Sequence, residues 1–237
     1  MRRTVLCLLM SGVVWAAACG VPATPAVPVE PVSEGAAASI PSTRPVARAE
    51  RPEVVFLGDS LTAGLGLPPE ESFPALIQQR LDEAGLDFAV VNAGVSGDTS
   101  AGGLRRLEWA LQGDPRVLIV ALGGNDGLRG LPPEDLRRNL AAIIEGGQRA
   151  GATVMLAGME APPNNGPDYT ARFRRVYPEL ARAYDIPLIP FLLEGVAGES
   201  SLNQADGIHP NPEGARRVAD TVWQALQPVV ERSAGAR

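Results

Sequence analysis

The chain has 237 residues, of which 45% are hydrophobic and 20% are charged, and its net charge is −6. These values are typical of a folded globular protein, and the length suffices for one sizeable domain or two small ones. The acidic balance and the lack of a Lys/Arg-rich run argue against nucleic acid and anionic membrane surfaces as partners.

The N-terminus resembles an export signal. In residues 1–18, Arg2 and Arg3 precede an apolar run that is too short for a membrane span and ends in small residues. The run closes on Cys19 in "AAAC", which resembles the bacterial lipobox, although Ala16 stands where such boxes more often carry Leu. We expect export to the periplasm or cell envelope and favour lipidation of Cys19; plain cleavage before Cys19 is the alternative.

Residues 19–50 read as a tether. Residues 20–50 contain six prolines among Ala, Val and Ser, so they bury too little apolar surface to offset the entropy of ordering. After a lipidated cysteine, such a segment would hold a soluble domain away from a membrane. The lipid anchor would then be the chain's only membrane contact. The remaining residues, 51–232, are predicted to form one folded domain.

Cysteine and histidine are scarce. Cys7 lies in the signal and Cys19 at its end, so the body has no thiol for a disulfide framework or a Cys-based metal site. With a single histidine, His209, a zinc site is not expected either. His209 is therefore the only candidate for histidine-based acid–base chemistry.

The body alternates apolar runs with helical patterns, which predicts a parallel sheet with helices on both faces, an α/β fold. Its last helix should begin with Asn211 as N-cap and Pro212 at the first helical position. Asp98 is the predicted N-cap of the second helix, and Pro178 is expected to bend the fourth. The strands are expected at 54–57, 88–94, 116–122, 153–159 and 186–191, and the helices at 73–85, 99–111, 131–151, 169–184 and from 211 onward.

Four polar clusters interrupt this pattern: "GDSLTAG", "NAGVSGDTS", "GGNDGLRG" and "DGIHPN". Three of them directly follow a predicted strand, and the carboxyl ends of parallel strands lie at one edge of a sheet, where sites gather. Each cluster alone has an ordinary structural interpretation, such as a turn, a cap or a surface histidine. Together they are expected to meet at one edge.

The clusters supply the parts of an acyl-transfer site. Ser60 is a weak nucleophile that needs an adjacent base, and His209 is the only imidazole available. Asp206 stands three residues before His209, close enough to accept a hydrogen bond from the ring and fix its tautomer.

An ester's tetrahedral intermediate also needs hydrogen-bond donors for its oxyanion. The Ser60 amide, a glycine amide near Gly97 and the side-chain amide of Asn125 are the candidates. Gly94 is a second glycine in the same cluster and stays open as an alternative to Gly97. Asp59, next to the nucleophile, is assigned to turn structure.

These blocks resemble the SGNH, or GDSL-type, hydrolases: the Ser of GDS, a Gly of the second block, the Asn of GxND and the His of DxxH. "SGDTS", "LGGNDGLRG" and "DGIHPN" closely resemble blocks of the bacterial thioesterase, lysophospholipase and arylesterase group of that family. The resemblance spans about residues 54–228. It implies a three-layer α/β/α sandwich with a central five-stranded parallel sheet of flavodoxin-like type, and no metal or organic cofactor.

The resemblance implies a serine esterase that hydrolyses small-molecule carboxylic esters or thioesters through an acyl-Ser60 intermediate, and we expect it to act as a monomer. Aryl esters, short or medium acyl esters, acyl thioesters and lysophospholipids are the implied substrates. The Pro/Gly-rich segments 64–72 and 159–169 are expected to wall the acyl pocket. A carbohydrate acetyl esterase of the same family and a non-catalytic tethered binding domain are the two alternatives.

Overall fold

A computed structural model of the chain describes residues 51–235. The predicted signal 1–18, the tether 19–50 and the predicted lipidation site Cys19 lie outside the described residues. Within 51–235, no helix is both long enough and apolar enough to cross a membrane.

In the described residues, five parallel strands form one sheet in the order β2-β1-β3-β4-β5. The strands are β1 (Glu53–Gly58), β2 (Ala89–Gly94), β3 (Pro115–Ala121), β4 (Thr153–Ala157) and β5 (Leu188–Ile189). In the register, Gly58 at the end of β1 pairs with Gly94 of β2 and Ala121 of β3. The loops that follow the three strands therefore start at one level, which brings the polar clusters of the sequence to one edge.

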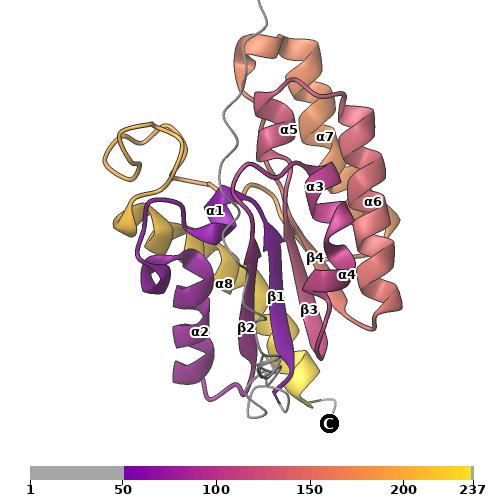
Figure 1. Cartoon of the computed structure of the whole chain (residues 1–237), viewed down its shortest axis with the longest axis vertical. Coiled ribbons are helices and arrows are strands. Elements are labelled where there is room, and N and C mark those ends of the chain that lie inside the picture. Colours follow the sequence, from indigo (N-terminus) through magenta and orange to yellow (C-terminus); the bar gives the residue numbers. More distant parts are fainter. Residues whose placement is uncertain (1–50, 236–237) are drawn as a thin grey trace, which may run out of the picture. The chain divides into compact units, whose positions relative to one another are not determined.

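Helices cover both faces of the sheet, which confirms the predicted three layers (Figure 1). Helices α2 and α8 pack on one face, and α3, α4, α6 and α7 lie on the other. The helices are α1 (Ser60–Ala63), α2 (Phe73–Glu83), α3 (Ser100–Arg105), α4 (Leu107–Ala110), α5 (Gly124–Leu128), α6 (Pro133–Arg149), α7 (Pro167–Ala183) and α8 (Pro212–Gly235), with 3-10 turns η2 (Pro69–Glu71) and η3 (Pro163–Asn165).

The neighbouring strands β1 and β3 are deeply buried. Every residue of β1 is buried, and so is all of β3 except Arg116. Phe56 of β1 meets Phe73 of α2 edge to face, with ring centroids 5.5 Å apart. Because the strand that carries Ser60 at its end is packed on both faces, the nucleophile candidate stands on a rigid support.

The predicted helix 99–111 is in fact two short helices, α3 and α4, which separate at Arg106. Arg106 has φ −108° and ψ 10°, outside helical geometry, and its guanidinium reaches back to the strand ends. The predicted N-cap was also wrong. Thr99 caps α3, accepting from the Gly102 amide, and the Asp98 carboxylate binds Arg106 instead.

The other boundaries agree more closely with the sequence. The Asn211 side chain accepts hydrogen bonds from the amides of Glu213 and Gly214 at 3.0 Å each, which confirms it as the cap of α8. Pro178 lies inside α7, which runs uninterrupted past it. The last strand is shorter than predicted, with only two residues in the ladder.

Candidate active site

Ser60 is the first residue of α1 and directly follows the turn that leaves β1. The buried Asp59 carboxylate caps this helix by accepting from the Leu61 amide at 3.0 Å, so its predicted structural role is confirmed. Gly58 keeps the turn tight, since a Cβ there would lie 1.9 Å from Oγ1 of Thr62. As the first helical residue, Ser60 has a backbone N–H without an intrahelical partner.

The loop before α8 holds the histidine in a fixed orientation. Nδ1 of His209 lies 2.7 Å from Oδ2 of Asp206, while Oδ1 of Asp206 accepts from the amides of Ile208 and His209. Gly207 between them has φ +68°, a left-handed conformation that suits glycine. The spacing of three residues thus lets the Asp206 carboxylate bind both the backbone amides of its own loop and the imidazole of His209.

The other ring nitrogen of His209 faces the serine. Nε2 lies 2.9 Å from Oγ of Ser60, although 149 residues separate the two in sequence. With the Nδ1 proton donated to Asp206, Nε2 is the ring nitrogen left as an acceptor for the Ser60 hydroxyl. The structure therefore brings Ser60, His209 and Asp206 together as a continuous hydrogen-bonded chain.

Gln204 secures this arrangement and was missed in the sequence. Its side-chain amide donates to the carbonyl of Leu65 at 2.7 Å, and its backbone amide donates to the carbonyl of His209. It thereby joins the histidine loop to the loop that follows Ser60. Nothing about a single glutamine in "NQADG" marks it in advance, because its partner is 139 residues away.

Hydrogen bonds from the backbone amide and the ring of His209, and from the Ile208 amide, hold the pKa of Asp206 well below its usual range. Asp206 consequently stays ionised at every pH at which the domain would work. An ionised carboxylate stabilises the imidazolium that forms when His209 takes a proton.

Asn125, near the start of α5, turns its side chain toward the same turn. Nδ2 donates to the carbonyl of Asp98 at 2.9 Å and lies 3.4 Å from Oδ2 of Asp59. The first contact fully uses one N–H, but the second is long and weak. One hydrogen of the Asn125 amide is thus available to a group in the adjoining cleft.

The structure separates the two glycines of the second block. Gly97 has φ +83° and lines the same cleft as Ser60, and within residues 51–235 its amide has no hydrogen-bond acceptor. Gly94 instead donates its amide to the Asn92 side chain, and a Cβ there would lie 2.3 Å from the backbone nitrogen of Ala63. Gly94 therefore serves close packing, and Gly97 is the glycine that can meet an oxyanion.

Ser60, Gly97, Asn125 and His209 open into one cleft of ≈ 840 Å³, whose lining is mostly apolar. As predicted, the segment 159–169 walls it, through Met159 to Pro163, whereas only Leu65 comes from 64–72. A further wall, from Phe191 to Gly198, was not predicted. It follows the two-residue strand β5, and no sequence pattern there distinguishes a pocket wall from a connecting loop.

Asp59, directly before Ser60, has an unusual environment. The residue is only 2% exposed, and this burial raises the pKa of its carboxyl to about 6, against the opposing effect of the hydrogen bond from the Leu61 amide. Within residues 51–235, no group of three or more His, Cys, Asp or Glu side chains is arranged to hold a metal ion.

Comparisons with known proteins agree with this geometry. Residues 56–217 match the GDSL-like Lipase/Acylhydrolase family. The chain is 46% identical to "Esterase TesA" of Pseudomonas aeruginosa, over 75% of this chain and 89% of that protein. It is 40% identical to "Thioesterase 1/protease 1/lysophospholipase L1" of Escherichia coli K12, over 75% of this chain and 84% of that protein.

A solved structure gives the same result. The psychrotrophic esterase EstA from Pseudoalteromonas sp., in a crystal structure inhibited by monoethylphosphonate, superimposes with a TM-score of 0.72 at 34% identity. The match covers 76% of this chain and 98% of that one. The family match spans more than half of this chain, and it includes both the serine turn and the histidine loop. This chain is therefore a hydrolase that belongs to the GDSL-like lipase/acylhydrolase family.

Proposed function

We propose that this esterase cleaves carboxylic esters and thioesters through an acyl intermediate on Ser60, with His209 as general base and Asp206 as its orienting partner. The observation that carries the proposal is the hydrogen-bonded chain from Asp206 through His209 to Ser60, which ends at an apolar cleft. Gly97, Asn125 and the Ser60 amide are the proposed oxyanion donors.

The proposed reaction has two halves. In the first, Nε2 of His209 takes the hydroxyl proton as Oγ of Ser60 attacks the carbonyl carbon, and the resulting oxyanion accepts the three donors' hydrogen bonds. Collapse breaks the bond to the leaving alcohol or thiol, which takes the proton from the imidazolium. In the second half, water attacks the acyl-serine with the same base, releasing the acid and restoring Ser60.

The shape and lining of the cleft support the proposal that the enzyme recognises the acyl chain of its substrate. Its apolar lining and its volume of ≈ 840 Å³ suit a hydrocarbon chain lying beside the nucleophile. The relatives' names include an esterase and a thioesterase/lysophospholipase, which supports both oxygen and sulfur leaving groups.

We also propose that the protein is exported and anchored by a lipid on Cys19, and that it acts as a monomer. The basic residues, apolar run and terminal cysteine of residues 1–19 support export and lipidation. Metabolic labelling with a clickable fatty acid tests the anchor: labelled wild type and unlabelled Cys19→Ala are expected, and an unlabelled wild type contradicts it.

The activity is tested with nitrophenyl esters and acyl thioesters of graded chain length on the purified full chain, with Ser60→Ala in parallel. We expect turnover by the wild type that depends on chain length, and none by the variant. Release of acetate from an acetylated glycan, with no turnover of nitrophenyl esters, would replace this proposal by a carbohydrate esterase.

A further inference from the structure

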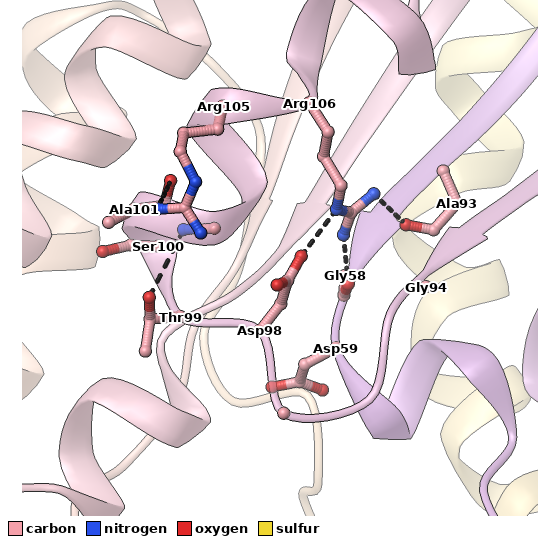
Figure 2. A network of polar contacts seen from close by, with 12 residues as sticks. Gly58, Asp59, Ala93, Gly94, Asp98, Thr99, Ser100, Ala101, Arg105 and Arg106 are labelled. Atoms are coloured by element: carbon pink, nitrogen blue, oxygen red, sulfur yellow. Dashed lines mark hydrogen bonds and ion pairs between the residues drawn. The ribbon is translucent and has the colours of Figure 1, made fainter. Parts of the chain in front are cut away.

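Arg106 contacts Gly58, Ala93 and Asp98 at the edge of the sheet that carries the active site (Figure 2). Its Nη2 donates to the carbonyl of Gly58, its Nη1 to the carbonyl of Ala93, and its Nε to Oδ2 of Asp98, each at 2.6 Å. The side chains of Arg106 and Asp98 are only 16% and 18% exposed. A guanidinium can do this because its donors form a rigid planar fork, which no other side chain offers.

The three contacts lie close to the proposed oxyanion donors. Gly58 ends β1 and stands two residues before Ser60. Ala93 lies at the end of β2, from which the chain turns toward Gly97. Asp98 directly follows Gly97 and also holds the third donor, because its carbonyl accepts from Nδ2 of Asn125.

Asp98 is the centre of this arrangement. Its side chain faces Arg106, while its backbone carbonyl faces Asn125. Moving the Asp98 backbone would shift Gly97 and Asn125 together. The break between α3 and α4 at Arg106 is what lets the guanidinium turn toward the strand ends.

We propose that Arg106 is a positioning residue that fixes the oxyanion donors through Gly58 and Asp98 without touching substrate. The inference rests on the proposed function, since it assumes that Gly97, Asn125 and the Ser60 amide meet an oxyanion. Replacing the Arg106 guanidinium would displace the oxyanion donors and weaken their hydrogen bonds, which matter most in the transition state. The replacement should therefore lower kcat and leave KM little changed.

The test compares Arg106→Lys, Arg106→Gln and Asp98→Asn with wild type, in kcat and KM for a nitrophenyl ester. Rates are expressed per active site, counted by complete reaction with a fluorophosphonate, and thermal unfolding is followed for every variant. Arg80→Gln is the matched control, because Arg80 likewise joins a carboxylate, Asp220, and a backbone carbonyl, Ala219, and none of these three lines the cleft.

We expect kcat per active site to fall on the order of 10- to 100-fold in both Arg106 variants, as when a catalytic group is misplaced by a fraction of an ångström. Lys is expected to fail because a single ammonium replaces the fork. The Asp98→Asn, Arg106→Gln double variant should lose no more than Arg106→Gln alone, since the two residues act as a unit. Arg80→Gln should keep the wild-type kcat.

Three results would overturn the inference while the wild type remains active: full kcat in Arg106→Lys, a loss matched by Arg80→Gln, or a loss confined to KM. If Arg106→Gln does not fold, Arg106→Lys and Asp98→Asn decide by the same criteria. A wild type that turns over no ester, or a Ser60→Ala variant that still does, would instead remove the proposed function.

Discussion

The two sides of the active site are built in opposite ways. The base side is local and open: Asp206 binds the ring and amide of a residue three positions later, and its side chain is 45% exposed. The oxyanion side is assembled from the ends of separate strands around buried groups, with Asp59 2% exposed. The base therefore depends on a short loop, whereas the oxyanion donors depend on the packing of the sheet.

The two carboxylates flanking the site show the difference in their electrostatics. Hydrogen bonds from His209 and Ile208 lower the pKa of Asp206, whereas burial raises the pKa of Asp59 to about 6. Hydrogen bonding favours the charged form and desolvation disfavours it. Asp206 is thus a stable anion that serves the base, while Asp59 holds its charge at a cost in stability.

The largest effect is expected when Ser60 or His209 is removed, because the base side and the oxyanion side of the site meet at these two residues. Ser60→Ala and His209→Ala should each lower kcat on the order of 10⁵–10⁶-fold, because the nucleophile and its base act as a unit. Neither side chain contributes to the core, so circular dichroism should match the wild type. Ser201→Ala, at an exposed serine near the same loop, is the control and should retain activity.

The oxyanion side alone is broken by Asn125→Ala. Loss of one preorganised donor should reduce kcat on the order of 10²–10³-fold. Steady-state kinetics on a nitrophenyl ester measures this loss. A reduction of less than tenfold would mean that Asn125 serves only the turn around Asp98 and Asp59.

The base side is tested by the pH dependence of the rate. His209 must be neutral to accept the Ser60 proton, so kcat/KM should fall as the solution is made more acidic. Asp206 stays ionised over this acidification because its pKa is lowered. A rate that is constant from pH 8 to pH 5 would contradict the role of His209.

The smallest effect concerns the stability of the oxyanion side. Because the pKa of Asp59 is raised on folding, its contribution to stability is fully present below the unfolded-state pKa and is lost as pH rises through about 6. At pH 8, Asp59→Asn should therefore be more stable than wild type, by at most about 3 kcal/mol of unfolding free energy. Thermal unfolding measures this as a higher unfolding temperature.

That advantage should shrink toward pH 4, where Asp59 is protonated and neutral in the wild type. The same variant should lose some activity, since its amide places a donor opposite Nδ2 of Asn125. A stability difference that does not change with pH would show that Asp59 carries no desolvation cost.

The sequence predicted the layered fold and the base side well, for a physical reason. Strand–helix alternation fixes a parallel sheet, and a spacing of three residues confines Asp206 and His209 to one loop. The fork of Arg106 escaped prediction because its partner carbonyl at Gly58 is 48 residues away and belongs to the backbone, which carries no sequence signal. Gln204 escaped prediction for the same reason, because its partner is the distant backbone carbonyl of Leu65. The cap of α3 was mispredicted because the Asp98 carboxylate binds Arg106 and does not cap the helix.

The most direct test of the account is to locate the residue that a fluorophosphonate modifies, since such reagents capture a serine only when a base and an oxyanion site activate it. Peptide mass mapping of the labelled full chain should place the adduct on Ser60, with no adduct in Ser60→Ala and much slower labelling in His209→Ala. An adduct on another serine, or a folded wild type that hydrolyses esters without being labelled, would contradict it.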